Sequence, residues 1–301
     1  MSWANELEFS DPHALSFPPM NDHSDILIEL ALAEDIGDGD VTSLYFIPEE
    51  LRACAFVAVR KDGVVSGVEL AARVFCTVDR ELDVEILIAD GSRVSAGALL
   101  IRVEGSARSI LTAERTALNF LQRLSGVATL TAQYVEQVRG THARILDTRK
   151  TTPGYRLLEK KAVLDGGGSN HRLGLHDRAM VKDNHLVAQG GLEAIQAAIT
   201  RLKSERPKVE VEVEADDLDQ VGTFLTMLGV DYILLDNMTI DELNAAVMLR
   251  GERGKPQLEA SGGITLETLR AIAKTGVDFI SVGALTHSAP ALDIGLDFET
   301  L

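Results

Sequence analysis

Hydrophobic and polar positions follow two different rhythms along the chain, and the change comes near residue 140. Near the N-terminus, DILIELALAED has apolar residues at helical spacing, and Ser24 just before it can cap the start of a helix. From about residue 51 to 110, short apolar runs such as RACAFVAV and ALLIRVEG are separated by glycines. This texture is typical of strands joined by turns, so the first half predicts an α+β domain.

A long amphipathic helix is predicted from roughly Ile110 to Val138, and Leu111, Leu118 and Leu121 mark its apolar face. Arg115 lies four residues after Leu111 and three before Leu118, so we expect it on the same side. A charged side chain there needs a partner, unless its head reaches solvent at the edge of the face. The helix alone leaves both interpretations open.

After residue 140, strand-like and helix-like runs alternate. The expected strands are ARILDT, AMVKD, KVEVEVE, YILLD, QLEAS and FISVG. Between them lie helix candidates such as LEAIQAAITRLK, LDQVGTFLTML, IDELNAAVMLR and LETLRAIAK. This order predicts parallel strands joined by right-handed crossovers, in a barrel or in a doubly wound sheet.

Polar residues at the ends of these strands distinguish the two folds. They are Asp147, Thr148, Arg149, Lys150, Lys182, Asp183, Glu212, Glu214, Asp236, Asn237, Ser261, Gly262, Gly263 and Gly283. A doubly wound sheet gathers its site at one switch point, whereas a barrel brings many strand ends together. No GxGxxG sequence follows the first strand. We therefore predict an α/β fold, with an incomplete (β/α) barrel as C-terminal domain and an α+β sandwich as N-terminal domain.

The same rhythms set the expected domain boundaries. We expect a flexible leader at 1–24, an N-terminal domain at 25–125, a catalytic barrel at 126–287 and a tail at 288–301 that can pack on the N-terminal domain. With 46% hydrophobic and 25% charged residues, the composition is that of an ordinary globular protein. No apolar run approaches the ~18 residues of a membrane span, so we expect no membrane association.

The cysteines indicate a cellular compartment. Cys54 and Cys76 both lie in apolar runs, so we expect buried, reduced thiols. The N-terminus also lacks the basic start and apolar core of a signal peptide. Together these features predict a cytoplasmic protein.

Charge is distributed unevenly. The net charge of -17 argues against nucleic acid as a partner. Nevertheless, one short central stretch holds Arg149, Lys150, Arg156, Lys160, Lys161, Arg172, Arg178 and Lys182. We interpret Lys160 and Lys161, in RLLEKK, as part of an ordinary solvated helix. Arg149, Lys150, Arg172 and Lys182 each lie next to a strand end or a glycine loop. Held together, these cations would repel one another, so we predict that they bind a multiply charged anion.

An acidic and glycine-rich zone complements the basic one. Glu212 and Asp236 end strands, where carboxylates can hold ribose hydroxyls or a hydrated Mg²⁺. SGG, from Ser261 to Gly263, and VGA, from Val282 to Ala284, follow the last two strands. Backbone N–H groups at those ends are a common phosphate site in barrels. A polycarboxylate pocket beside a ribose-phosphate pocket predicts phosphoribosyl transfer to an acidic acceptor.

These segments together carry a family likeness. DTRKTTPGYRLLEKKAVLDGGGSNHRLGLHDRAMVKDNH, with EDIGDGDVTS and ERTALNFLQRLSGVAT before it and SGGI and VGALTHS after it, resembles the quinolinate phosphoribosyltransferase family over roughly residues 25 to 290. The resemblance implies conversion of quinolinate and phosphoribosyl pyrophosphate to nicotinate mononucleotide, pyrophosphate and CO2 in NAD biosynthesis. It also implies use of Mg²⁺, no organic cofactor, and a homodimer with shared active sites, with higher assembly left open.

Residue roles follow from the same resemblance. It implies that Arg149, His171 and Arg172 bind the quinolinate carboxylates, and that Arg115 reaches this pocket from the partner subunit. Lys150, Lys182, Glu212 and Asp236 are expected to be catalytic, the last two holding ribose hydroxyls and metal. The full expected substrate-binding set is Arg115, Thr148, Arg149, Lys150, His171, Arg172, Lys182, Glu212, Asp236, Ser261, Gly262, Gly263, Val282, Gly283 and Ala284.

Three alternatives stay open at this point. The segment between Glu212 and Asp236 is longer than the family pattern, so Glu214 competes with Glu212 as the functional carboxylate, and we choose Glu212. A Schiff-base aldolase would use Lys182 as its nucleophile. A binding protein without turnover, or a related phosphoribosyltransferase acting on another acidic ring, would keep much of the same pocket.

Overall fold

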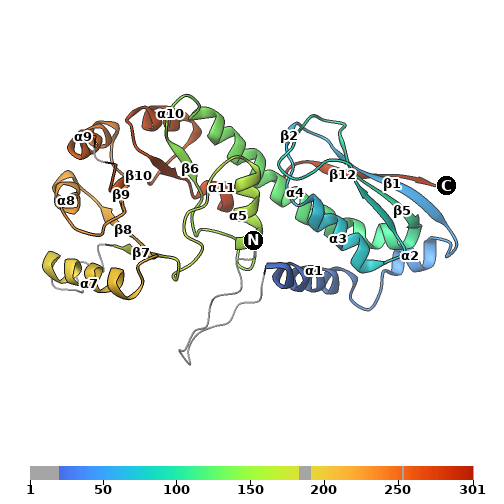
Figure 1. Ribbon diagram of the computed structural model, residues 1–301. Helices are drawn as coiled ribbons and strands as arrows, with labels where there is room; N and C mark the ends of the chain where they lie inside the picture. The colour runs from blue at the N-terminus through green and yellow to red at the C-terminus, as the bar shows by residue number, and fades with distance from the viewer. Residues whose placement is uncertain (1–19, 183–190, 253, 301) are drawn as a thin grey trace. The chain divides into compact units, whose positions relative to one another are not determined.

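The computed structural model describes residues 20–182, 191–252 and 254–300 (Figure 1). Its contacts divide the chain into two compact units: unit 1 is Met1–Gly126 with Pro290–Leu301, and unit 2 is Val127–Ala289. No helix in the described part is long and apolar enough to cross a membrane. The expected strand-end residue Asp183 lies outside the described residues.

Unit 1 is an antiparallel sheet with helices, the α+β architecture expected for this half. Its four-stranded sheet has the order β12-β1-β5-β3. The strands are β1 (Arg52–Val59), β3 (Asp83–Ile86), β5 (Leu99–Ser106) and β12 (Ile294–Thr300), with a small second sheet of β2 (Gly63–Val64) and β4 (Arg93–Val94). The helices are α1 (Met20–Ile36), α2 (Val41–Phe46) and α3 (Val68–Val78).

The long helix α4 (Ala107–Gln137) confirms the span predicted from its leucines to within three residues at its start. It runs through the residue at which the two units divide. Strand β12, close to the C-terminus, pairs antiparallel with β1 from Val59↔Ile294 to Ala53↔Thr300. The chain therefore returns to unit 1 after completing unit 2.

Unit 2 is built from strand–helix repeats. Its strands are β6 (Arg144–Leu146), β7 (Arg178–Val181), β8 (Glu210–Ala215), β9 (Tyr232–Asp236), β10 (Gln257–Ser261) and β11 (Phe279–Ser281). Its further helices are α5 (Arg156–Asp165), α7 (Leu192–Glu205), α8 (Leu218–Phe224), α9 (Ile240–Arg250), α10 (Leu266–Lys274) and α11 (Ala284–His287). All six expected strands and four expected helices are confirmed.

The six strands form one parallel sheet with the order β6-β11-β10-β9-β8-β7. Because β11, the last strand in sequence, pairs with β6, the first, the sheet curls back on itself as a barrel does. No pairing of β6 with β7 occurs within the described residues, and Ser169 instead pairs with Leu146, the last residue of β6. The incomplete (β/α) barrel is thus confirmed.

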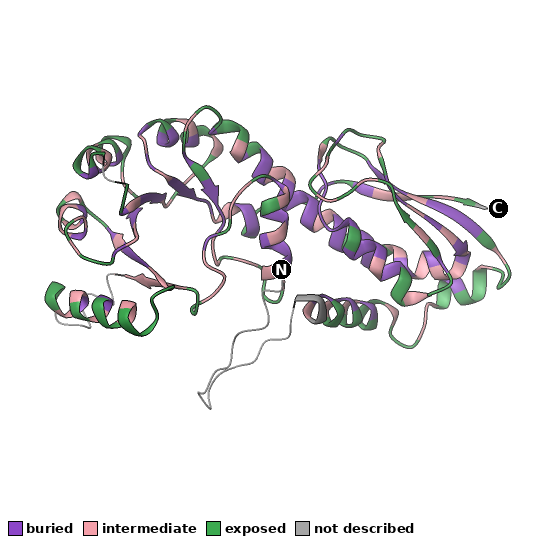
Figure 2. Ribbon diagram, in the orientation of Figure 1, coloured by how far each residue is buried: buried purple, intermediate pink, exposed green. Residues whose placement is uncertain are grey.

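Burial follows this architecture. The strands of unit 2 are largely buried, while the helices beyond them expose their outer faces (Figure 2). In β8, Val211, Val213 and Ala215 are buried on one face, and glutamates occupy the other. A strand that is buried on both sides yet carries charges on one face needs partners for those charges inside the barrel.

Two local expectations, those for Ser24 and Cys76, are wrong, and the head of Arg115 reaches solvent, as one of its two interpretations held. Helix α1 begins at Met20, so Ser24 lies within it and is not its cap. Cys54 is buried as expected, but Cys76 is exposed on α3, whose buried face is formed by other residues; both thiols are free. Arg115 lies on the exposed side of α4, with 58% of its side chain accessible and Glu114 3.8 Å away.

Candidate functional site

The interior face of β8 carries three glutamates at three depths of the barrel. Glu210, Glu212 and Glu214 are two residues apart, so their side chains share one face of the strand. At the amino end, Glu210 receives hydrogen bonds from Arg178 (3.0 Å) and from the Tyr232 hydroxyl (3.0 Å). The other two therefore lie progressively nearer the carboxyl-end rim, where barrel enzymes place their sites.

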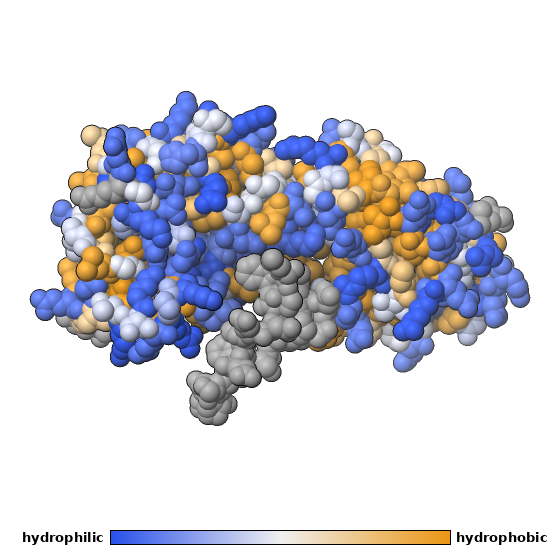
Figure 3. Space-filling view, in the orientation of Figure 1, coloured by the Kyte–Doolittle hydropathy of each residue, from blue (hydrophilic) through white to orange (hydrophobic). Residues whose placement is uncertain are grey.

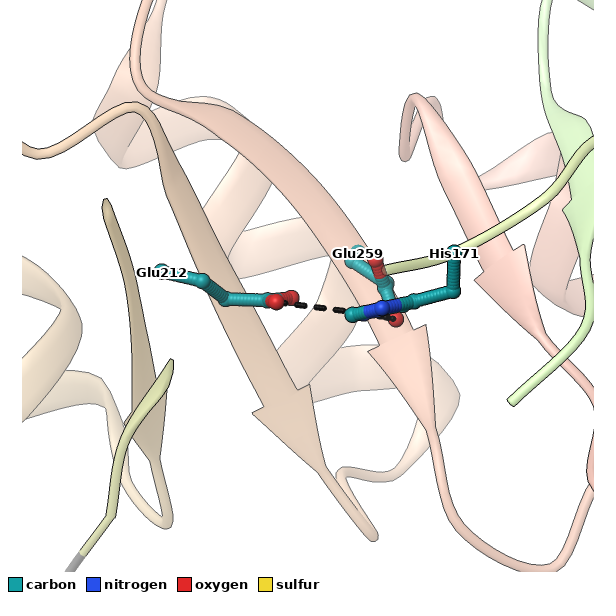
Figure 4. Close-up of side chains that lie close together, drawn as sticks. All are labelled: His171, Glu212 and Glu259. Atoms are coloured by element: carbon teal, nitrogen blue, oxygen red, sulfur yellow. Dashed lines mark ion pairs between the residues drawn. The ribbon is translucent and has the colours of Figure 1, made fainter. Parts of the chain in front are cut away.

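The middle layer is a buried cluster of His171, Glu212 and Glu259 (Figure 4). The imidazole Nε2 lies 3.1 Å from Glu212 Oε2 and 3.5 Å from Glu259 Oε1, and both carboxyl groups have no solvent exposure. Arg178 Nη1 lies 3.6 Å from Glu212 Oε2. Two acids are thus balanced by one arginine and one histidine, as burial without water requires.

Every polar group of His171 faces protein. Its backbone N–H donates to Asp147 Oδ1 (2.8 Å), and its carbonyl accepts from Lys160 Nζ (2.9 Å). Its Nδ1 accepts the backbone N–H of Arg172 (2.6 Å), while Nε2 faces the two glutamates. The residue is only 7% exposed, so its expected contact with a substrate carboxylate stays a prediction.

Proton affinities in this cluster reflect burial and the neighbouring charges. Burial opposes a charged imidazole, but Glu212 and Glu259 outweigh it and raise the pKa of His171 to about 9. Burial would also raise the pKa of Glu212, yet His171 and Arg178 lower it. For Glu259, burial and the adjacent Glu212 raise the pKa. In the folded protein, His171 and Glu259 therefore keep their protons up to a higher pH than they do in the unfolded chain.

Stability should consequently fall as the pH rises from neutral to alkaline. His171 has an unfolded pKa near 6.5 and a folded pKa of about 9, so its contribution is complete below pH 6.5 and lost as the pH passes through about 9. A charged imidazole carries a proton on Nδ1 and cannot accept the N–H of Arg172, and the loss of this contact offsets part of the stabilisation. The free energy of unfolding should therefore fall by at most about 3 kcal/mol. Urea unfolding across this range measures it, and Glu259→Gln should flatten the slope. An unchanged slope in that variant would contradict the assignment.

Four cations lie on or beside β6 and β7. Arg149 and Lys150 follow β6, Lys182 follows β7, and Arg172 donates from Nη1 to the carbonyl of Arg178 (3.1 Å), the first residue of β7. Burial and the positive charge of Arg149 both lower the pKa of Arg172. An anion bound beside Arg172 would offset this unfavourable charge.

Thr148 fixes the start of the basic loop. Its Oγ1 accepts the backbone N–H of Lys150 (3.0 Å), which makes a tight turn directly after β6. The carbonyl of Lys150 in turn accepts from Thr286 Oγ1 (2.7 Å) in α11. The expected residues Thr148, Arg149 and Lys150 are therefore held by the framework, with Arg149 half-buried and Lys150 exposed.

The acidic zone has a different composition from the expected one. Carboxylate oxygens of Glu214, Asp216 and Asp236 all lie within 4.8 Å of one another, whereas Glu212 belongs to the buried His171 cluster. Lys182 donates a hydrogen bond to Glu214 Oε2. Three half-exposed or exposed carboxylates in this arrangement are a donor set that suits Mg²⁺, which retains several waters. The structure thus pairs Asp236 with Glu214 and not with Glu212.

Two glycine turns follow the last two strands. In the turn after β10, Gly262 has φ +93°, and a Cβ there would lie 2.1 Å from Asn237 Oδ1, so only glycine fits. Gly263 (φ +58°) has nothing within 4 Å of the Cβ position, which leaves its backbone open. After β11, a Cβ on Gly283 would meet the Lys150 side chain at 3.0 Å. The Ser261–Gly263 turn therefore offers exposed backbone beside Asp236, and the Val282–Ala284 turn lies next to the basic loop.

The GGG sequence before His171 serves packing. A Cβ on Gly166 would lie 2.4 Å from the carbonyl oxygen of Ala128, and one on Gly168 would lie 2.8 Å from Thr131. Both contacts are with α4, so the absence of side chains allows this loop to approach the helix closely. Close packing against α4 therefore accounts for Gly166 and Gly168, and neither glycine is evidence for a bound anion.

Three residues of this site were missed by the sequence reasoning. Glu259 could have been found, because a charge in the middle of the apolar strand QLEAS must point into the barrel or be paired. Asp216 follows β8 directly, but a polar residue in a loop carries little signal. Lys160, which we interpreted as solvated, is only 3% exposed, so that interpretation is wrong; Lys161 is partly exposed and pairs with Asp165 (2.9 Å).

Comparisons with known proteins cover both units. The family model described as quinolinate phosphoribosyl transferase, N-terminal domain, matches residues 40–125, and the corresponding C-terminal domain model matches residues 127–297. The two matches follow each other with almost no gap, so the likeness extends from unit 1 through unit 2.

Individual relatives agree. A chloroplastic nicotinate-nucleotide pyrophosphorylase [carboxylating] of Arabidopsis thaliana is 44% identical, over 94% of this chain and 85% of its own. The corresponding protein of Mycobacterium leprae is 43% identical, over 90% and 95%. The solved structure of the nicotinate-nucleotide pyrophosphorylase from Francisella tularensis superposes with a TM-score of 0.85 at 40% identity, covering 95% of this chain and 98% of that one.

Proposed function

Because the chain belongs to the quinolinate phosphoribosyl transferase family, we propose that it converts quinolinate and phosphoribosyl pyrophosphate to nicotinate mononucleotide, pyrophosphate and CO2. This is a decarboxylating phosphoribosyl transfer in NAD biosynthesis. The observation that carries the proposal is the pair of domain matches spanning residues 40–297. The charges of the barrel rim then supply the chemistry.

The basic loops suit the dicarboxylate. Quinolinate carries two carboxylates on adjacent ring carbons, and Arg149 and Arg172 offer planar donors whose geometry matches a carboxylate. Lys182 adds a point charge beside Glu214 of the acidic zone, and Lys150 adds one in the loop after β6. His171, directly before Arg172, is held through its backbone by Asp147 and Lys160. Bound in this way, the pyridine ring would present its nitrogen to the activated sugar in the neighbouring acidic zone.

The acidic zone suits the activated sugar. We assign the ribose hydroxyls and a hydrated Mg²⁺ to Glu214 and Asp236, with Asp216 beside them. Bound there, Mg²⁺ would help to neutralise the charge of the pyrophosphate. The turns at Ser261–Gly263 and Val282–Ala284 would take the 5′-phosphate through backbone N–H groups. Glu212, the carboxylate that we expected in this role, is fully buried in the layer below.

Catalysis then rests on positioning and charge. The C1–O bond of the sugar breaks, its electron pair leaves with the pyrophosphate, and the pyridine nitrogen forms the new bond to C1. Lys150 and Lys182 stabilise negative charge on the departing group. The quaternary nitrogen next draws electrons from the adjacent ring carbon, so CO2 leaves from that position and a proton replaces it. The side chains bind and orient, and none is needed as a nucleophile.

A Schiff-base mechanism is disfavoured by the surroundings of Lys182. Its Nζ donates a hydrogen bond to Glu214 and is therefore held by a carboxylate of the acidic zone. A Schiff-base lysine must instead have its nitrogen lone pair free to attack a carbonyl carbon. Borohydride treatment with a carbonyl compound should therefore leave the mass of the protein unchanged.

A direct assay tests the proposed function. The protein is incubated with quinolinate, phosphoribosyl pyrophosphate and Mg²⁺, and released CO2 and nicotinate mononucleotide are measured. We expect both products in equal amounts, and neither when nicotinate replaces quinolinate. Product formation from nicotinate alone would point to a phosphoribosyltransferase for another acidic ring, and binding of both substrates without product would point to a protein that has lost turnover.

We further propose that the protein is a homodimer whose partner contributes Arg115 to each pocket. In unit 1, α2 exposes Val41, Leu44, Tyr45 and Phe46, the two aromatic residues by 82% and 80%. Exposed aromatic residues of this size are typical of interfaces. Hydrophobic residues are also visible over unit 1 on the face drawn in Figure 3. Arg115 is largely exposed, which leaves it accessible to an anion held by a second subunit.

Mixing two inactive variants tests this shared site. Arg115→Ala and Arg149→Ala subunits, dissociated and reassociated in equal amounts, should recover about a quarter of wild-type activity, because each hybrid dimer has one intact site. The matched control mixes Arg149→Ala with Arg172→Ala. Both residues belong to unit 2 of the same pocket, so this pair should recover nothing. Equal activity in the two mixtures, with subunit exchange verified, would contradict the shared site.

We also propose a cytoplasmic location. Both cysteines are free in the structure, as a reducing compartment allows, although the Arabidopsis relative is named chloroplastic. Cell fractionation with the tagged full chain tests this, and recovery with an organelle or envelope fraction would contradict it.

A further inference from the structure

Helix α5 lies between the two loops that carry the expected carboxylate-binding residues. One loop, residues 147–155, follows β6 and contains Arg149 and Lys150; the other, residues 169–173, contains His171 and Arg172. Neither loop is regular secondary structure, apart from the bridge of Ser169 to Leu146. Something outside the loops must therefore hold their cations in place against mutual repulsion.

Lys160 joins the two loops at their base. Its Nζ donates to Asp147 Oδ1 (2.5 Å) in the first loop and to the carbonyl of His171 (2.9 Å) in the second. The same Asp147 oxygen accepts the N–H of His171 (2.8 Å), so three buried groups close a ring of hydrogen bonds. The exposed fraction is 0% for Asp147, 3% for Lys160 and 7% for His171. Such a ring fixes both loops relative to one another.

Two further side chains of α5 hold the first loop along its length. Glu159, also fully buried, accepts from the backbone N–H (2.9 Å) and from the hydroxyl (2.8 Å) of Thr152. Arg156 donates to the carbonyl of Leu173 (3.2 Å) and, at 3.4 Å, to that of Arg149. Arg156, Glu159 and Lys160 together thus contact both loops. Their contacts lie before and after Arg149 in the first loop and before and after Arg172 in the second.

We propose that α5 is the positioning element of the carboxylate pocket, with Lys160 as its central residue and Arg156 and Glu159 as its supports. The inference rests on the proposed function. Lys160 is a positioning residue, because its ammonium is used within the framework and acts on substrate only through Arg149 and Arg172. The acidic trio Glu214, Asp216 and Asp236 and the Ser261–Gly263 turn belong to other strands and the turns after them.

This division predicts a selective kinetic effect. Lys160→Met should raise the KM for quinolinate at least tenfold, because both arginine loops lose their common anchor. The KM for phosphoribosyl pyrophosphate should change less than threefold, because Lys150 comes from these loops but Glu214, Asp236 and the Ser261–Gly263 turn lie on other strands. The matched control is Lys161→Met, the neighbouring lysine of the same helix, which pairs with Asp165 (2.9 Å) near the end of α5. It should leave both KM values unchanged.

Arg156→Met keeps the test decisive if Lys160→Met does not fold. Arg156 is only half-buried, so its loss should spare the fold, and we expect a severalfold rise in the quinolinate KM alone. Circular dichroism and thermal melting establish that each variant is folded. Equal increases in both KM values, or none in a folded variant, would overturn the inference. Absence of quinolinate turnover in the wild-type protein would instead refute the proposed function, so the two failures are distinguishable.

Discussion

Arg172→Ala is expected to lower kcat/KM for quinolinate by about 10²–10³-fold, because a charge-assisted, bidentate contact with a carboxylate is worth roughly 3–4 kcal/mol once water is excluded. Arg172 is half-buried, and its pKa is lowered by burial and by Arg149. Most of the loss should appear in the KM, since the carboxylate is bound equally in the ground state and in the transition state.

Steady-state kinetics with each substrate varied in turn measure this effect. Arg149→Ala should behave similarly, since its guanidinium belongs to the same group of cations. Arg201→Ala is the matched control: it removes an exposed arginine from α7, outside the described site, and should change kcat/KM by less than twofold. If Arg172→Ala and Arg201→Ala have equal kinetics, the carboxylate pocket lies elsewhere.

The second large effect separates two glutamates that are only two residues apart. Glu214→Gln should lower kcat by about 10²-fold and raise the Mg²⁺ concentration needed for half-maximal rate, because Glu214 shares the acidic rim with Asp216 and Asp236. Glu212→Gln should mainly destabilise the protein, by about 2–4 kcal/mol, because it removes the buried carboxylate that faces both His171 and Arg178. Asp236→Asn should resemble Glu214→Gln.

Mg²⁺ titrations of the rate, with urea unfolding of the same variants, distinguish these outcomes. The contrast is internal to one strand, so each variant serves as a control for the other. If Glu212→Gln changed the Mg²⁺ dependence and Glu214→Gln changed only stability, the assignment from geometry would be reversed. Our first choice from the sequence would then be restored.

The repeating elements of unit 2 were predictable because their signals are local. β9, β10, α9 and α10 have the bounds expected from their apolar periodicity, and two of these helices begin at a threonine whose side chain closes a capping box. The barrel itself was predictable from polar residues at many strand ends, since only a closed ring brings these together. Family resemblance then gave the activity.

The layers of the barrel were not predictable from the sequence. Alternation places Glu212 and Glu214 on one face, but the depth of each depends on the register of β8 with β7 and β9, which the strand alone does not encode. The role of Lys160 was hidden for a similar reason. RLLEKK reads as a solvated helix, and only the packing of α5 shows that Lys160 points toward Asp147 while Lys161 does not.

Equilibrium binding of quinolinate and of nicotinate to the wild-type protein tests the central claim, that cations from separate loops form one pocket for a pyridine dicarboxylate. Isothermal titration calorimetry should show quinolinate binding at least about 30-fold more tightly, because the second carboxylate gains a charge-assisted contact of roughly 2 kcal/mol. The difference should vanish in Arg149→Ala/Arg172→Ala. Equal affinity for the two acids in the wild-type protein would contradict the account.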